Sequence, residues 1–208
     1  MSAYVIGDIN VTNPRTYAKY AAAVPNSSGA FGGKYLVRGP DKCRPAEGDW
    51  HPQRFVLAEY KDVETIKAWY YSDEYKELAQ LRQSASTGSL LVAQGVESNT
   101  QGSSTGRAAY LVGDIEVTDS EKYSTYASGV PETVAAYGGK YLVRGVSGEV
   151  LEGSWDPKRL VVLEFESMEQ AKAWYDSPEY ADLKKLRQSA SIGKLIFASG
   201  SSVSYTHL

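Results

Sequence analysis

The sequence has few of the residues that build disulfide-stapled or metal-binding proteins. It holds one cysteine, Cys43, and two histidines in 208 residues. A single cysteine cannot close an internal disulfide, and no second cysteine lies beside it to form a metal-binding pair. We therefore expect no bound metal and no cofactor, and haem ligation would have to rest on His51. A reducing, cytoplasmic location is the default expectation.

Long apolar runs and an excess of charge of one sign are also lacking. No window approaches the ~20 apolar residues of a membrane-spanning helix, and the start has no basic leader. The net charge is −3, and the 22 Lys and Arg residues are dispersed along the chain. These features argue against a membrane or a nucleic acid as partner. A small organic ligand or substrate remains the expected partner.

What the sequence does contain is a second copy of itself. The text that begins at Tyr4 returns at Tyr110, and GGKYLVRG occurs at 32–39 and again at 138–145. Such extensive identity indicates duplication of one ancestral unit. We expect a first repeat at 1–96, a flexible linker rich in Gly, Ser and Thr at 97–106, a second repeat at 107–200 and a C-terminal tail at 201–208.

Each repeat has the pattern of a β-α-β-β-α-β unit. In the first, β-branched runs predict strands at 3–11, 34–38, 54–60 and 90–93, and helical spacing predicts helices at 14–31 and from 62 onward. Pro25 should bend or break the first helix, and Ser72 with Asp73 should interrupt the second.

The fold class follows from this order of elements. A βαββαβ unit folds most simply as an antiparallel ferredoxin-like sheet with both helices on one face. The bare face needs cover, and two linked copies can cover each other. We therefore expect an α+β fold in which two ferredoxin-like repeats pack sheet to sheet as an intramolecular pseudo-dimer. A higher homo-oligomer stays open.

Several motifs carry a family resemblance over nearly all of both halves. In the second half they are YGGKYLVRG at 137–145, EGSW at 152–155, LVVLEF at 160–165, AWYDSPEY at 173–180 and LRQSAS at 186–191. They resemble a bacterial domain family of unknown function in the dimeric α+β-barrel superfamily, near the NIPSNAP and antibiotic-biosynthesis monooxygenase groups. The resemblance implies two protomers fused into one barrel. The first half departs from these motifs between Pro40 and His51, so we expect the second copy to hold the more intact site.

Three polar residues in each half lie inside otherwise apolar strands, where a charge is costly to bury unless it is paired or used. They are Asp8, Arg38 and Glu59 in the first half, and Asp114, Arg144 and Glu164 in the second. In the ferredoxin-like order their strands are neighbours, so a guanidinium between two carboxylates is possible. That cluster could bind an acidic or phenolic ligand through arginine and remove a proton through a carboxylate. A purely structural ion pair is the alternative.

Aromatic residues are abundant, with 16 tyrosines and 4 tryptophans. Most should pack in the core. A cavity between helices and sheet, lined by tyrosine hydroxyls, would nevertheless suit a planar, partly polar ligand. The candidates for substrate binding are the arginines above with Tyr35, Tyr141, Trp50, Trp155 and His51, and the two tryptophans could cover a pocket from the long connections.

Three interpretations of function remain. The resemblance implies a cofactor-independent enzyme that acts on an aromatic or polyketide-like compound as an isomerase, cyclase or monooxygenase. Its catalytic carboxylates would be Asp8, Glu59, Asp114 and Glu164. The second interpretation is a non-catalytic protein that holds a ligand in the same cavity. The third is a structural module whose sheet faces are fully used in self-assembly.

Overall fold

A computed structural model describes residues 1–97 and 107–201 of the chain. The first half contains β1 (Ala3–Val11), α1 (Pro14–Ala30), β2 (Lys34–Pro40), β3 (Cys43–Glu47), β4 (Arg54–Tyr60), α2 (Val63–Tyr70), α3 (Asp73–Gln83) and β5 (Ser86–Gln94). The second contains β6 (Ala109–Val117), α4 (Ser120–Ala136), β7 (Lys140–Val146), β8 (Glu149–Glu152), β9 (Leu160–Phe165), α5 (Met168–Tyr175), α6 (Pro178–Ala190) and β10 (Ser191–Ser199). The predicted linker and tail lie outside the described residues, apart from Glu97 and Ser201.

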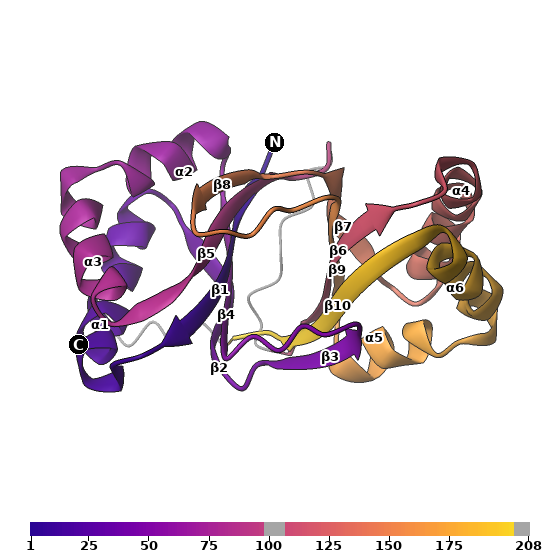
Figure 1. Cartoon of the computed structure of the whole chain (residues 1–208), viewed down its shortest axis with the longest axis horizontal. Helices are drawn as coiled ribbons and strands as arrows, with labels where there is room; N and C mark the ends of the chain where they lie inside the picture. The colour runs from indigo at the N-terminus through magenta and orange to yellow at the C-terminus, as the bar shows by residue number, and fades with distance from the viewer. Residues whose placement is uncertain (98–106, 202–208) are drawn as a thin grey trace.

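The strands form two five-stranded antiparallel sheets, ordered β2-β4-β1-β5-β8 and β3-β10-β6-β9-β7. Four strands of each sheet follow the ferredoxin-like order. Helices α1 to α3 cover the outer face of the first sheet and α4 to α6 that of the second, while the inner faces turn toward each other (Figure 1). The predicted α+β barrel of two packed repeats is confirmed.

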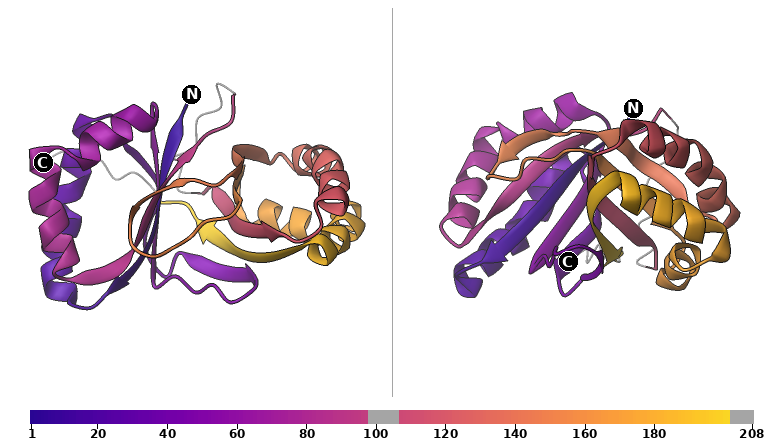
Figure 2. Two further views of the ribbon diagram at one scale, coloured as in Figure 1. Left: turned by 45° about the horizontal axis from the view of Figure 1, so that its top comes forward. Right: turned by 45° about the vertical axis from the view of Figure 1, so that its right-hand side comes forward.

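The fifth strand of each sheet comes from the opposite half. After β2 the chain crosses to the second sheet, where β3 pairs with β10, and β8 returns to pair with β5 (Figures 1 and 2). We had interpreted these segments as long connections without a strand. The signal was hidden because β3 is a short edge strand that contains Pro45, and proline is tolerated only at such edges. The two halves are therefore interlocked as well as packed.

Capping residues set the helix boundaries. The Asn13 side chain accepts a hydrogen bond from the Thr16 amide at 3.1 Å where α1 begins. Of the bend or break predicted at Pro25, the break does not occur, since α1 continues through this residue and buries an apolar face on the sheet. The predicted interruption of the second helix is confirmed, because α2 ends at Tyr70 and Ser72 caps α3 by accepting from the Tyr75 amide at 3.2 Å. No helix in the described parts is long and apolar enough to cross a membrane.

Candidate functional site

The predicted aspartates lie between the two sheets and hold tryptophans in place. Asp8 accepts a hydrogen bond from the Trp50 indole nitrogen at 2.8 Å, and Asp114 accepts one from Trp155 at 2.8 Å. Asp114 also accepts from two backbone amides of the following segment, at 2.8 and 3.2 Å. These bonds tie the ends of the crossover connections to β1 and β6. The aspartates therefore position the connections.

The two tryptophans meet inside the barrel, with ring centroids 5.2 Å apart. Trp50 is 7% exposed and belongs to the core between the sheets, so it does not cover a pocket as we had expected. Trp155 is partly buried against the same core. His51 is exposed, with its Nε2 3.2 Å from Asp49. These side chains contribute packing and a surface contact.

The predicted glutamates also face the space between the sheets. Glu59 accepts a hydrogen bond from the Tyr4 hydroxyl at 3.0 Å, and Glu164 forms an ion pair with Lys140 at 2.9 Å. Burial, together with the carboxylates beside them, raises the pKa of Tyr4 and of Tyr110, its counterpart in the second half. Both glutamates are buried and engaged in structural contacts.

The predicted arginines lie on the opposite, helix-covered faces. Arg38 donates to the carbonyl of Ala21 on α1, and its guanidinium lies 5.0 Å from the centre of the Tyr35 ring. Arg144 repeats these contacts with Ala127 at 2.9 Å and Tyr141 at 4.8 Å. Because side chains alternate across a strand, the sheet separates the arginines from the carboxylates. The predicted Asp, Glu and Arg cluster is therefore not formed.

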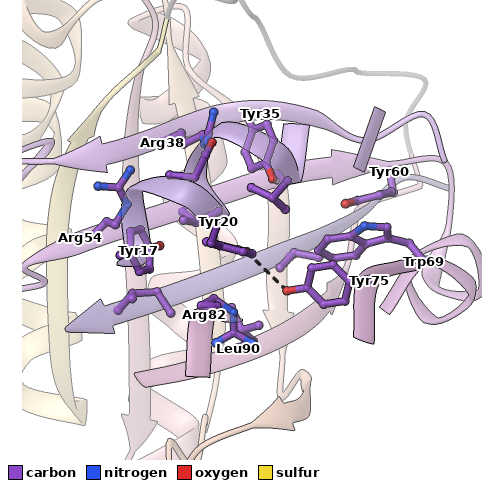
Figure 3. Close-up of a pocket in the computed structure, with 16 residues that line it drawn as sticks. Tyr17, Tyr20, Tyr35, Arg38, Arg54, Tyr60, Trp69, Tyr75, Arg82 and Leu90 are labelled. Carbon is purple, nitrogen blue, oxygen red and sulfur yellow. Dashed lines mark hydrogen bonds between the residues drawn. The ribbon is translucent and has the colours of Figure 1, made fainter. Parts of the chain in front are cut away.

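Tyrosine and arginine side chains instead enclose a cavity between the helices and the sheet of the first half (Figure 3). Its volume is about 30 Å³, which exceeds the ~10–15 Å³ that one water molecule requires. The tyrosines that line it are Tyr17, Tyr20, Tyr35, Tyr60 and Tyr75, and the arginines are Arg38, Arg54 and Arg82. Arg38 and Tyr35, two of the residues predicted to bind a substrate, are among its lining residues.

Burial raises the pKa of the tyrosine hydroxyls that line the cavity and so favours their protonated form. It raises the pKa of Tyr35 to about 12 and that of Tyr20 well above its ordinary value. The pKa values of Tyr17 and Tyr60 are raised for the same reason. Near neutral pH these four hydroxyls are therefore protonated and can donate hydrogen bonds to a ligand.

A wider groove of about 680 Å³ adjoins the cavity and shares Tyr17, Ala21 and Arg54 with it. This volume lies within the ~300–1,000 Å³ typical of small-molecule sites. The Arg54 guanidinium lies 4.9 Å from the centre of the Tyr17 ring. Within residues 1–97 and 107–201, no carboxylate lies within ion-pair distance of Arg54 or Arg38. Arg54 thus lines both spaces without a carboxylate partner, and Arg38 lines the cavity only.

Asp41 is the carboxylate among the groove's lining residues. Its φ of 54° makes it the one non-glycine residue with a left-handed backbone in the described parts. Aspartate tolerates this conformation better than most residues, and such outliers are enriched at functional sites. The equivalent position of the second half, directly after β7, is Ser147. Asp41 cannot be singled out from the sequence, because it lies in a turn-rich segment where an aspartate is ordinary.

Arg82 closes the cavity and belongs to an ion-pair cluster that the sequence analysis missed. Its two terminal nitrogens donate to both oxygens of Glu152 on β8, at 3.0 and 2.6 Å. In the same way, the two terminal nitrogens of Arg187 donate to both oxygens of Glu47 on β3, at 2.9 and 2.7 Å. Each arginine thereby clamps the strand received from the other half. The signal was present, since EG-x-W and LRQSAS each occur in both halves.

The comparison with protein families agrees with this architecture. The family model described as "Domain of unknown function (DUF1330)" matches residues 2–96 and again residues 108–201. The chain belongs to the DUF1330 family. It carries two copies of the domain, which confirms the resemblance stated from the motifs. No curated protein matches the chain.

Solved structures with the same fold cover nearly the whole DUF1330 tandem. An anthrone oxidase-like protein is 13% identical, with 96% of this chain and 91% of that chain covered and a TM-score of 0.52. A mutant chlorite dismutase from Candidatus Nitrospira defluvii, in complex with cyanide, is 10% identical, with 96% and 90% covered and a TM-score of 0.56. At these identities the likeness concerns the fold alone.

Proposed function

We propose that this DUF1330 tandem is a small-molecule enzyme that binds a planar organic compound with an acidic oxygen, at the groove and cavity of the first half. The observation that carries the proposal is Arg54, which lines both spaces and has no carboxylate partner in the described parts. A cation without a counter-ion at the mouth of a ligand-sized groove favours an anionic ligand.

The volumes of the two spaces support a position for the ligand in the groove. A ring system does not fit a cavity of about 30 Å³, but it fits the adjoining groove of about 680 Å³. The body of the ligand therefore lies against the α1 face of the groove, near Tyr17 and Ala21. Its acidic oxygen faces Arg54, and a small group reaches inward to the tyrosines.

This arrangement favours chemistry on an acidic C–H or O–H bond. A guanidinium beside an enol or phenol stabilises the conjugate base, which lowers the pKa of the substrate. Asp41, on the groove wall, is the carboxylate that takes the proton. Return of a proton to another carbon gives an isomer. Addition of O2 to the carbanion and protonation of the peroxide give a hydroperoxide, which then loses water to leave one oxygen atom in a new C=O group. These are the isomerase and cofactor-free monooxygenase reactions.

Calorimetric titration with 2-naphthoate, a planar aromatic anion, tests the binding step. Replacing the positive charge by Arg54→Gln should weaken binding at least tenfold. Arg159→Gln is the matched control, since Arg159 is the counterpart of Arg54 and lies 5.4 Å from the Tyr123 ring in the second half. We expect the control to bind like the wild type. Equal loss in both variants, or none in either, would contradict the placement of the site.

Oxygen uptake with anthrone as substrate tests the reaction, a choice suggested by the name of the anthrone oxidase-like neighbour. Asp41→Asn should lower kcat by tenfold or more and change KM little.

One observation favours non-catalytic binding instead. The carboxylates predicted to be catalytic are engaged with tryptophan, tyrosine or lysine side chains inside the barrel; they are Asp8, Glu59, Asp114 and Glu164. Tight binding without turnover of any enolisable ketone would support that alternative.

A further inference from the structure

We propose that the deep end of the first-half cavity is a subsite for one carbonyl oxygen of the ligand, bound by the Nε–H group of Arg82. The inference rests on the proposed function and deepens it. The ligand then carries a carbonyl oxygen at the end remote from its acidic group. The inference also assigns one such site to each chain, because the second half is built differently at the same place.

The donor is identified by an unmade hydrogen bond. Arg82 is 2% exposed and lines the cavity, and its terminal nitrogens are engaged with Glu152. Its Nε is buried without a hydrogen-bond partner among the described residues. Buried N–H groups are nearly always satisfied, and one left without an acceptor is destabilising. An acceptor atom supplied by a ligand would complete this site.

The second half shows how the same donor is satisfied when no ligand is needed. There the Nε of Arg187 donates to the Tyr180 hydroxyl at 3.2 Å. Tyr75 is the counterpart of Tyr180, but its hydroxyl lies 3.5 Å from that of Tyr20 (Figure 3). The two copies therefore differ in whether the buried arginine has an acceptor within the protein.

Charge and size together point to a carbonyl oxygen. The bidentate contact with Glu152 already neutralises the charge of Arg82, so a second anion would meet no net positive charge there. A cavity of about 30 Å³ accommodates one oxygen atom on a thin stem, but not a ring. A neutral, single-atom acceptor meets both conditions, whereas the anionic group of the ligand belongs at Arg54.

Side-chain volume confines the subsite to the first half. One row of the first sheet places Ala58, Val5 and Val92 side by side on the helix-covered face. The same row of the second sheet holds Leu163, Leu111 and Phe197. All three replacements are larger, and the Phe197 ring packs 5.5 Å from that of Tyr175. Val5 and Ala58 line the cavity, so the larger leucines at their equivalent positions take up space at the same place in the second half.

A pair of isosteric probes tests the subsite by calorimetric titration of the full chain. In 4-acetylbenzoate a C=O group lies opposite the carboxylate, and 4-isopropenylbenzoate replaces that oxygen by CH2. We expect the ketone to bind at least tenfold more tightly than the alkene, with one equivalent per chain. The bound C=O stretch should move to lower wavenumber in the infrared spectrum, as a hydrogen-bonded carbonyl requires.

Two variants exchange the residues that the two halves carry at one equivalent position, Ala58 and Leu163. Ala58→Leu introduces the residue found at the equivalent position of the second half, and it should abolish the preference for the ketone. Leu163→Ala is the matched control and should leave preference and stoichiometry unchanged, because Arg187 keeps its bond to Tyr180. Equal affinity for the two probes, an unshifted carbonyl stretch or two equivalents per chain would overturn the inference. Failure of both probes to bind would overturn the proposed function itself.

Discussion

The clamp between Arg187 and Glu47 gives the sharpest test of how the two halves are held together. Replacing Glu47 by alanine removes the acceptor of both guanidinium bonds and leaves Arg187, which is fully buried, without a counter-ion. Hydrogen bonds from Tyr175 and Gln188 to the same carboxylate are lost as well. The perturbation therefore falls on one end of a strand that the first half donates to the second.

The size of the effect follows from the burial of the pair. Breaking a buried ion pair by removing one partner typically costs about 3–5 kcal/mol, mostly because a charge is left uncompensated. Glu47 is 19% exposed, which leaves some access to water, whereas the Arg187 side chain is 1% exposed. We expect Glu47→Ala to lower the free energy of unfolding by about 3 kcal/mol or more. With an m value of about 2 kcal/mol/M this is a midpoint lower by about 1.5 M urea.

A double variant separates this reasoning from a simple loss of contacts. In Glu47→Ala with Arg187→Met the buried charge is gone, so the double variant should be more stable than Glu47→Ala alone. Urea unfolding followed by circular dichroism gives both values. The explanation is refuted if the single variant loses less than about 1 kcal/mol, or if the second substitution adds further destabilisation.

Three further predictions concern the pH dependence of stability and the aspartates that hold the tryptophans. Burial alone would raise the pKa of Glu47 and Glu152, but hydrogen bonds from Arg187 and Arg82 lower both pKa values below the ordinary 4.5. The stability that the two ionised carboxylates contribute is therefore present above pH 4.5 and is lost as the pH falls further. Urea midpoints measured from pH 7 to 3 should fall more gently in the Arg187→Met variant than in the wild type. Burial raises the pKa of Tyr35 to about 12 from the ordinary 10.0, so its contribution to stability declines as the pH rises above 10, and Tyr35→Phe should remove one late-titrating group from the absorbance titration at alkaline pH. Asp114 accepts three hydrogen bonds where Asp8 accepts one, so Asp114→Ala should be about 2 kcal/mol more destabilising than Asp8→Ala in thermal unfolding, and equal losses would contradict this account.

The repeat, the order of the elements and the sheet-to-sheet packing were all predictable from the sequence. Periodicity and caps are local signals, and the uncovered face of a βαββαβ unit demands a second layer. The exchange of β3 and β8 was not predictable in this way. An edge strand with Pro45 reads as a turn, and the choice of which sheet it joins depends on contacts far along the chain, such as Arg187 with Glu47.

The candidate site was predictable only in part. Residue type and strand position identified Asp8, Arg38 and Glu59 as unusual, but the face on which each side chain lies depends on register and bulges. A register shift between Tyr35 and Val37 places Arg38 on the helix-covered face, away from the two carboxylates. Arg54 could not be singled out, because an arginine at a strand start is common and its lack of a partner is a property of the three-dimensional structure.

Interlocking makes the site proposed in the first half depend on the second half. Glu152, which holds Arg82 at the cavity wall of the first half, lies on β8 and therefore belongs to the second half. The first half alone would lack both that strand and the counter-ion of its buried arginine. Leu111 and Leu163 are larger than the Val5 and Ala58 that line the cavity of the first copy, yet the second copy still supplies the counter-ion of Arg82. A duplicated barrel with exchanged strands can in this way carry a single site that needs both halves.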